Sequence, residues 1–176
     1  MIQFWHVRIV VRNLSAFLLQ QVNNIERRGF TNVVDIRFIS HAQDQHFAAI
    51  ERLFVSVNRY KKPLNGSKVL ILGVAYKPNI NDIRESPAFD IIHLLQEKGA
   101  EVSYYDPYVP ELNHEFFHLF SEKDLASAVE KADCVAIITN HSKVDYAMVH
   151  EKAALIFDAR NALKDIAKKS SKVVKL

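Results

Sequence analysis

The sequence predicts an α/β fold, a doubly wound Rossmann-like parallel sheet preceded by a helical arm. From Lys68 onward, short apolar runs alternate with segments of helical periodicity, which is typical of parallel strands joined by helices. The 176 residues, of which 49% are apolar and 24% charged, suffice for one globular domain with an additional arm. We therefore divide the chain into a divergent N-terminal segment with a connecting helix, residues 1–60, and a ligand-binding domain, residues 61–176.

Five apolar runs are the expected strands of this sheet. The longest uninterrupted runs, Val69–Leu72 and Val135–Ile138, are far too short to span a bilayer, and the N-terminus lacks a signal-peptide pattern. These features predict a cytoplasmic protein with no membrane partner. The strands are expected at Lys68–Ala75, Glu101–Tyr105, Cys134–Thr139, Leu155–Asp158 and, as a short final strand, Lys172–Leu176.

The strongest helix signal covers Pro87–Lys98. Ser86 is a favourable N-cap, Pro87 suits the first helical position, and Gly99 is a C-terminal stop. Further helices are expected at Glu122–Lys131 and Asp145–Lys152. Upstream, Asp44–Tyr60 has the spacing of an amphipathic helix, the arm that leads into the domain, whereas residues 1–43 form no clear βαβ unit.

Charge and cysteine content narrow the function classes. The formal net charge of +3 is spread along the chain, which does not suggest nucleic acid but suits a ligand that carries phosphates. The single cysteine, Cys134, excludes a disulfide framework and a zinc site built from several thiolates. It lies in an apolar strand, where a thiol packs as a small hydrophobic group and is a poor nucleophile. We therefore assign no catalytic residue in this chain.

The loop from Gly73 to Pro87 follows the first expected strand and is the main candidate site. Ligands of open α/β sheets bind beyond the carboxyl ends of the strands, and Lys77, Arg84 and the next helix N-terminus could bind an anion there. Alternatively, Lys77 is a solvated lysine and Arg84 forms a surface ion pair with Asp82 or Glu85. Gly73 is the only glycine between positions 66 and 99, so the dinucleotide fingerprint with three glycines is missing.

Three other polar signals need an interpretation. The run from His114 to His118 matches the zinc motif His-Glu-x-x-His, but it lies in a short α/β crossover without a convincing third ligand. We predict no metal site, and a surface helix with Phe116 and Phe117 packed inward. Asp106 lies too far from Gly73 for a ribose-binding acid and is expected to form a turn. His141 follows a strand and either lines the site or caps the next helix.

Four motifs together resemble the C-terminal domain of the UDP-glucose/GDP-mannose dehydrogenase family. They are Lys68-Val-Leu-Ile-Leu-Gly-Val-Ala-Tyr-Lys-Pro with Asp82-Ile-Arg-Glu-Ser-Pro87, Tyr105-Asp-Pro-Tyr-Val-Pro110, Asp133-Cys-Val-Ala-Ile-Ile-Thr-Asn-His141 and Phe157-Asp-Ala-Arg-Asn161. The similarity spans about residues 44 to 163. The second motif and residues 141–146 are most similar to the branch that acts on UDP-N-acetylhexosamines.

The resemblance implies an enzyme that oxidises the C6 hydroxyl of a nucleotide sugar in two NAD-dependent steps through a covalent thiohemiacetal. It implies that Lys77 and Arg160 contact the UDP-sugar and that Arg84 reaches the pyrophosphate of NAD. The family's glycine-rich NAD loop and nucleophilic cysteine segment have no counterpart in these 176 residues. We therefore expect a partner, either an N-terminal NAD-binding domain or a split subunit. The alternatives are an inactive nucleotide-binding or regulatory module that forms a homodimer through residues 1–60, and an unrelated flavodoxin-like domain.

Overall fold

The computed structural model describes residues 63–168 and 170–175. The predicted arm helix and the predicted domain boundary at residue 60 lie outside these residues. Five parallel strands form one sheet in the order β2-β1-β5-β6-β7, and two further strands form a separate hairpin. The strands of the sheet are β1 (Lys68–Leu72), β2 (Glu101–Tyr105), β5 (Cys134–Ile137), β6 (Ile156–Asp158) and β7 (Val173–Lys175).

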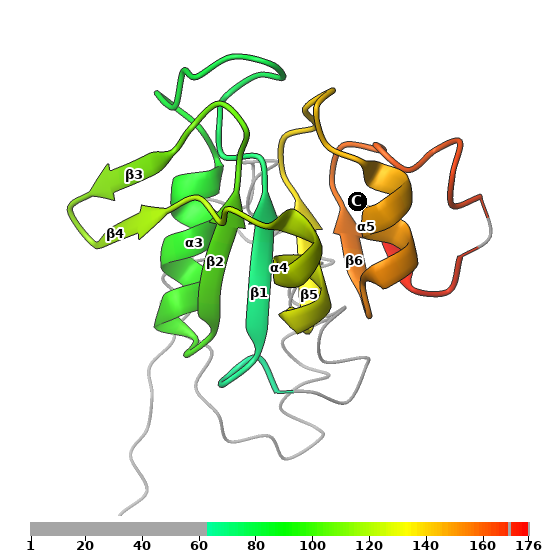
Figure 1. Ribbon diagram of the computed structural model, residues 1–176. Coiled ribbons are helices and arrows are strands. Elements are labelled where there is room, and N and C mark those ends of the chain that lie inside the picture. Colours follow the sequence, from blue (N-terminus) through cyan, green and yellow to red (C-terminus); the bar gives the residue numbers. More distant parts are fainter. Residues whose placement is uncertain (1–62, 169, 176) are drawn as a thin grey trace, which may run out of the picture. The chain divides into compact units, whose positions relative to one another are not determined.

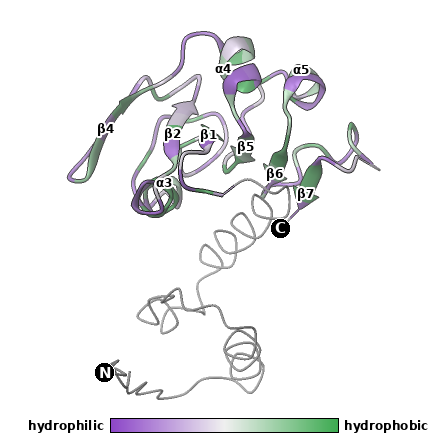
Figure 2. Ribbon diagram, turned by 90° about the horizontal axis from the view of Figure 1, so that it is seen from below, coloured by the Kyte–Doolittle hydropathy of each residue, from purple (hydrophilic) through white to green (hydrophobic). Residues whose placement is uncertain are grey.

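Helices cover both faces of the sheet, as predicted for a doubly wound fold. They are α3 (Ala88–Glu97), α4 (Leu125–Lys131) and α5 (Tyr146–Lys152). Figure 2 shows α3 on one side of the sheet and both α4 and α5 on the other. None of the helices in the described part of the chain is both long and apolar enough to cross a membrane.

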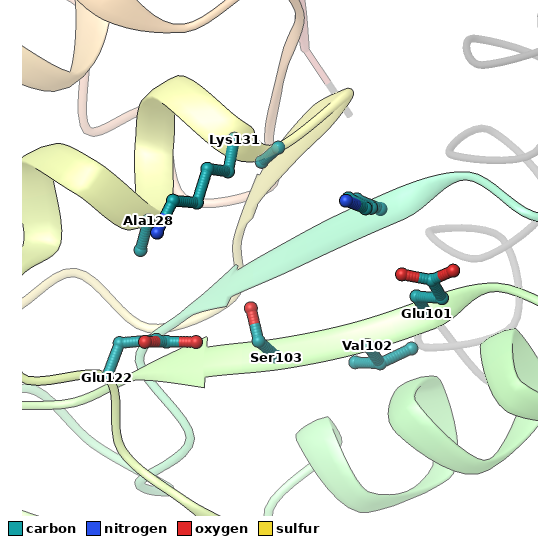
Figure 3. Close-up of a pocket in the computed structure, with 8 residues that line it drawn as sticks. Glu101, Val102, Ser103, Glu122, Ala128 and Lys131 are labelled. Carbon is teal, nitrogen blue, oxygen red and sulfur yellow. The ribbon is translucent and has the colours of Figure 1, made fainter.

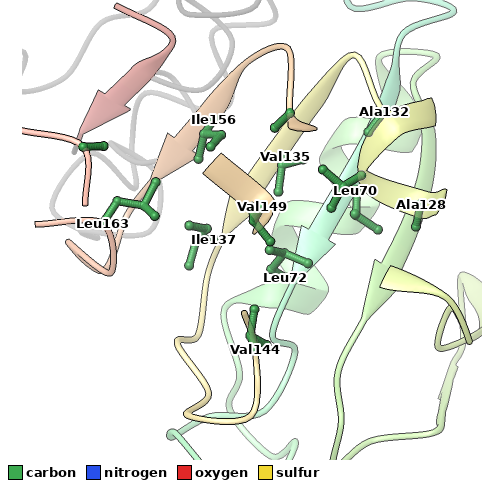
Figure 4. Close-up of a cluster of buried hydrophobic side chains, with 13 residues drawn as sticks. Leu70, Leu72, Ala128, Ala132, Val135, Ile137, Val144, Val149, Ile156 and Leu163 are labelled. Carbon is green, nitrogen blue, oxygen red and sulfur yellow. The ribbon is translucent and has the colours of Figure 1, made fainter. Parts of the chain in front are cut away.

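The core follows from the alternation of side chains along the strands. Leu70 and Leu72 of β1 point toward α4 and α5, where they join Val135, Ile137 and Val149 in one buried cluster (Figure 4). The opposite face is covered by α3, which buries five apolar residues and contacts β2. Each fully buried aliphatic side chain contributes about 1.5–3 kcal/mol to folding. The sheet therefore provides a rigid support for the loops at its carboxyl edge.

The ends of the elements follow the expected capping chemistry. Asp145 is the N-cap of α5 and accepts hydrogen bonds from the N–H groups of Ala147 and Met148. The helix α3 ends where Gly99 adopts a φ of 80°, and the N–H of Ala100 then donates to the carbonyl of Leu95. The predicted stop at Gly99 is confirmed.

The predicted helix at the His114–His118 motif is wrong. This segment forms an antiparallel hairpin of β3 (Glu111–His114) and β4 (Phe117–Phe120), which projects beside α3 in Figure 1. Phe117 is buried as predicted, but Phe116 lies in the turn and is 58% exposed. Burial along β3 alternates, with Leu112 inward and its neighbours outward, which is the period of a strand rather than a helix.

Candidate functional site

The candidate site lies where the strand order reverses, at the carboxyl ends of β1 and β5. The chain continues from β1 to β2 on one side of the sheet and from β5 to β6 on the other, so the loops after β1 and β5 diverge at this point. Figure 1 shows both loops, residues 73–87 and 138–145, at the same edge of the sheet. A crevice at this position is the usual ligand site of open α/β sheets.

Gly73 begins the first loop in a backbone conformation that favours glycine. Its φ is 78°, and a Cβ atom there would overlap the carbonyl of Thr139. The Oγ1 of Thr139 donates to the carbonyl of Ala75 at 2.7 Å. The two loops are therefore in direct contact over their first residues.

Asp106 is the buried anchor of these loops. Only 3% of it is exposed, and its Oδ2 accepts hydrogen bonds from the N–H groups of Val74 (2.8 Å) and Ala75 (3.2 Å). Its Oδ1 accepts from the N–H groups of Tyr108 (2.8 Å) and Val109 (3.2 Å). The predicted role of Asp106 in forming a turn is thus confirmed, and the same carboxylate also binds the loop after β1.

Burial and hydrogen bonding act on Asp106 in opposite directions. Burial alone would raise the pKa of the Asp106 carboxyl, but the hydrogen bonds from His141, Tyr108 and Val74 outweigh it and hold this pKa below its ordinary value. Asp106 therefore stays ionised at neutral pH. A buried anion is tolerated here because five donors surround it.

His141 links Asp106 to the far side of the first loop. The His141 side chain is fully buried, with its Nε2 2.9 Å from Oδ2 of Asp106 and its Nδ1 accepting from the N–H of Asn79 at 2.9 Å. The predicted alternative that His141 caps the next helix is wrong, because Asp145 is the N-cap of α5.

Asn79 and Ser142 fasten the two loops together, and sequence reasoning missed both. The Oδ1 of Asn79 accepts from the N–H and the Oγ of Ser142, each at 2.9 Å, and Tyr108 donates its hydroxyl to the same atom at 3.4 Å. Asn79 has a φ of 65°, in the left-handed region that asparagine tolerates better than most residues. The sequence signal that could have identified Asn79 is an asparagine in a loop whose only glycine is Gly73, because asparagine is the next residue type to adopt a positive φ.

The three predicted site residues lie on exposed loops at the carboxyl edge of the sheet. Lys77 follows β1, between the anchored residues Ala75 and Asn79, and its Nζ lies 5.3 Å from the ring centre of Tyr76. Arg160 follows β6, and its N–H donates to Oδ1 of the buried Asp158. Lys77 and Arg160 thus face the same edge from strands on either side of β5, but no contact joins them.

Arg84 forms the ion pair with Asp82 that the alternative interpretation expected. Its Nε and Nη2 donate to the two carboxylate oxygens of Asp82, at 3.0 and 2.9 Å. The hydrogen bonds from Arg84 lower the pKa of Asp82 to about 2. The side chain of Arg84 is nevertheless 86% exposed, so the ion pair leaves it accessible to solvent.

The N-terminus of α3 contributes less to an anion site than predicted. The N–H of Ala88 donates to Oγ of Ser86 at 3.3 Å, and the N–H of Phe89 donates to the Ser86 carbonyl at 3.4 Å. Asp90 adds a negative charge in the first turn. The cationic side chains, rather than this helix end, are therefore the candidate anion ligands.

A cavity of about 290 Å³ lies elsewhere, between β2 and α4 (Figure 3). Its charged lining is mixed, with Lys68 and Lys131 beside Glu101 and Glu122. None of the three predicted site residues lines it. This cavity is therefore separate from the candidate site at the strand ends.

The two histidines of the His114–His118 motif have separate partners. The ring of His114 packs against Phe89 and Phe117, with centroid distances of 5.2 Å in both cases. His118 lies with its Nε2 2.6 Å from Oε1 of Glu111. The zinc motif requires both imidazoles on one helical face, and the hairpin does not provide that face.

Comparison with known proteins identifies the family to which these loops belong. Residues 70–165 match the UDP-glucose/GDP-mannose dehydrogenase family, UDP binding domain. The chain belongs to this family. The matched region contains both loops of the candidate site and all three predicted site residues. The alternative of an unrelated flavodoxin-like domain is therefore wrong.

Two relatives are enzymes named for different UDP-sugars. The chain is 32% identical over 118 residues to the UDP-N-acetyl-D-mannosamine dehydrogenase of Methanococcus maripaludis, covering 62% of this chain and 26% of that protein. It is 37% identical over 109 residues to the UDP-glucose 6-dehydrogenase TuaD of Bacillus subtilis, covering 56% of this chain and 23% of that protein. The matched part is therefore about a quarter of the length of these relatives.

Solved structures show the same fold in this family. The UDP-N-acetyl-mannosamine dehydrogenase Cap5O from S. aureus superimposes with a TM-score of 0.51 at 32% identity, covering 74% of this chain and 29% of that one. A UDP-D-ManNAc dehydrogenase from Pyrococcus horikoshii gives a TM-score of 0.57 at 24% identity, covering 77% and 32%. The UDP-binding domain described above is thus one part of larger proteins.

Proposed function

We propose that this chain is the UDP-sugar-binding part of an NAD-dependent nucleotide-sugar 6-dehydrogenase. Such an enzyme oxidises the C6 hydroxyl of a UDP-hexose or UDP-N-acetylhexosamine to the uronate. The observation that carries the proposal is Lys77, a cation at the reversal point of the sheet on a backbone anchored on both sides. A fixed cation at this edge suits a diphosphate, and membership of the UDP-binding family supports uridine diphosphate as the common part of the ligand.

Lys77 and Arg160 are the proposed contacts to the UDP-sugar. Both are exposed and lie on loops at the same edge of the sheet, so a diphosphate and its sugar could extend across β5 between them. The backbone around Arg160 is held by Asp158, which accepts from the N–H groups of Arg160, Ala162 and Leu163. Relatives with either kind of sugar match similarly well, so the proposal leaves the hexose open.

NAD would be bound mainly by a partner, either an N-terminal domain or a split subunit. The four glycines of this chain do not form a dinucleotide loop, so its residues do not fit the main NAD site. NAD, when bound, accepts the hydride removed from the sugar. From this chain, the exposed side chain of Arg84 would contribute positive charge near the NAD pyrophosphate.

The state of the lone thiol supports the proposal that the catalytic nucleophile lies on the partner rather than on this chain. Cys134 is fully buried in β5, and burial raises its pKa to about 12. A thiol in that state cannot attack a sugar aldehyde. The same observation is consistent with the second candidate, an inactive nucleotide-binding or regulatory module that dimerises through residues 1–60.

Calorimetry with UDP tests the proposal. The chain should bind UDP in the micromolar-to-millimolar range, and Lys77→Glu should abolish binding because it places a negative charge beside the diphosphate. Lys98→Glu is the matched control, since Lys98 is also exposed but follows α3 at the opposite edge of the sheet. This control should bind UDP as the wild type does.

Two results separate the candidates. A folded wild-type chain that shows no heat with millimolar UDP would contradict the nucleotide-binding proposal. If Lys77→Glu removes UDP binding, the binding site is supported, and sedimentation of the same variant then tests the second candidate. A regulatory dimer should keep its association state in Lys77→Glu, because that role does not use the diphosphate contact.

A further inference from the structure

The loop that carries Lys77 is anchored on both sides of this residue. Before it, the N–H groups of Val74 and Ala75 donate to Asp106. After it, the N–H of Asn79 donates to Nδ1 of His141 at 2.9 Å. Lys77 and Pro78 form the exposed tip between these two anchors.

The two anchors are joined by one buried contact. The Nε2 of His141 lies 2.9 Å from Oδ2 of Asp106, and both side chains are fully buried. A backbone N–H can only donate, so Nδ1 of His141 must be the unprotonated nitrogen, and Nε2 carries the proton that is donated to Asp106. The imidazole therefore has one defined tautomer, with a donor on one side and an acceptor on the other.

We propose that His141 is a positioning residue that fixes Lys77 for the nucleotide. The inference rests on the proposed function, because it assigns a role within the same site. His141 does not contact Lys77 directly. It accepts a hydrogen bond from the backbone N–H of Asn79, two residues after Lys77, and its other ring nitrogen is bound to the buried Asp106. Its ring also packs against Tyr108, at 5.1 Å between centroids, and Tyr108 donates its hydroxyl to Asn79.

The physical reason is the entropy of the loop. Lysine is a flexible side chain, and a loop that samples several backbone conformations would present its charge at the diphosphate only part of the time. The apparent affinity falls in proportion to the fraction of molecules in the binding-competent conformation. An anchor on each side of Lys77 keeps this fraction high before the ligand arrives.

The test compares His141→Leu with His141→Gln in the full 176-residue chain, with UDP as the probe. Leucine keeps apolar volume but removes the donor and the acceptor, so we expect UDP affinity to fall about tenfold. Glutamine offers an amide N–H to Asp106 and a carbonyl oxygen to the N–H of Asn79. We expect His141→Gln to bind UDP within about threefold of the wild type.

A double-mutant cycle distinguishes positioning from general stability. If His141 acts through Lys77, His141→Leu should cause no further loss of affinity in a Lys77→Ala background. Thermal unfolding of every variant shows whether the sample is folded. His118→Leu is the matched control, because His118 is exposed on the hairpin and contacts Glu111 and Phe120 there, away from Lys77. The UDP affinity of this variant should stay unchanged.

A second variant keeps the test valid if His141→Leu does not fold. Asn79→Ala changes an exposed residue and removes the acceptor for Ser142 and Tyr108, so it loosens the same side of the loop. We expect it to weaken UDP binding about fivefold.

The outcomes separate this inference from the proposed function. A wild type that does not bind UDP contradicts the proposed function. A wild type that binds UDP, with folded His141→Leu and Asn79→Ala that bind equally well, overturns the role of His141. Losses from His141→Leu and Lys77→Ala that add fully would also overturn it, because the two residues would then act independently.

Discussion

Asp106 and His141 form a buried polar pair that joins the loops after β1, β2 and β5. A buried carboxylate is costly unless hydrogen bonds replace its lost hydration, and Asp106 accepts from four backbone N–H groups and from His141. Removing one member of such a group leaves the others buried and unpaired, which costs more than a typical surface change. The pair therefore holds the loops at this edge against one another.

Cys134 provides a test at the level of one side chain. We predict that the native chain reacts slowly with a thiol reagent such as dithionitrobenzoate, because Cys134 is fully buried and burial raises its pKa to about 12. Unfolding in guanidinium chloride should expose the thiol and increase the labelling rate by several orders of magnitude. Absorbance of the released thionitrobenzoate measures both rates. Rapid labelling of the folded chain at neutral pH would contradict the buried position.

The positions of the site residues were predictable from sequence to different degrees. Lys77, Arg84 and Arg160 follow apolar runs that are recognisable as strands, so their place at the carboxyl edge follows from the fold class. The contact between Asn79 and His141 joins residues 62 positions apart, and no local pattern predicts it. Only the register between β1 and β5 brings them together.

At the scale of secondary structure elements, Gly73 allows the residue after β1 to approach the backbone of Thr139, which follows β5. We predict that Gly73→Ala destabilises the chain by more than about 3 kcal/mol, because the added Cβ meets the carbonyl of Thr139 and the φ of 78° is unfavourable for alanine. Denaturant unfolding measures the loss.

Gly66→Ala is the matched control for this substitution. Gly66 also has a φ of 78°, but nothing lies within 4 Å of the position of a Cβ there. Gly66→Ala should lower the free energy of unfolding by only about 1 kcal/mol, because alanine is strained in this backbone conformation but meets no neighbouring atom. Equal losses at the two glycines would show that the contact with Thr139 does not restrict β1.

The elements that sequence reasoning recovered are those with strong local signals. Gly99 ends α3 as predicted, and the helix begins and ends within one residue of the predicted bounds. The predicted N-cap Ser86 is wrong, because Pro87 occupies the N-cap position. The hairpin was missed because the His-Glu-x-x-His spacing in a crossover suggested a helix, while its strands are only four residues long. Strands of that length carry too few alternations to exclude a helix from sequence alone.

At the scale of the whole molecule, the position of the site follows from the strand order β2-β1-β5-β6-β7. The loops after β1 and β5 diverge there, and the cations after β1 and β6 face the same edge. The described cavity lies instead beside β2 and α4, away from these cations. Under the proposed function, a partner that covers this edge of the sheet would exclude water and bring NAD toward the sugar.

This arrangement predicts that ligand binding and catalysis can be separated in the isolated chain. UDP that binds only the folded state stabilises it by about 2.7 kcal/mol at a hundredfold excess over Kd, which raises Tm by about 5–10 °C. Differential scanning calorimetry with UDP measures this shift, and Lys77→Glu should remove it.

The same chain, given NAD and a UDP-sugar, should produce no absorbance at the NADH maximum, because its lone thiol is buried in β5. Measurable NADH from the purified chain would show that the reaction does not depend on a second domain. A Tm that UDP does not change would contradict UDP binding by the folded chain.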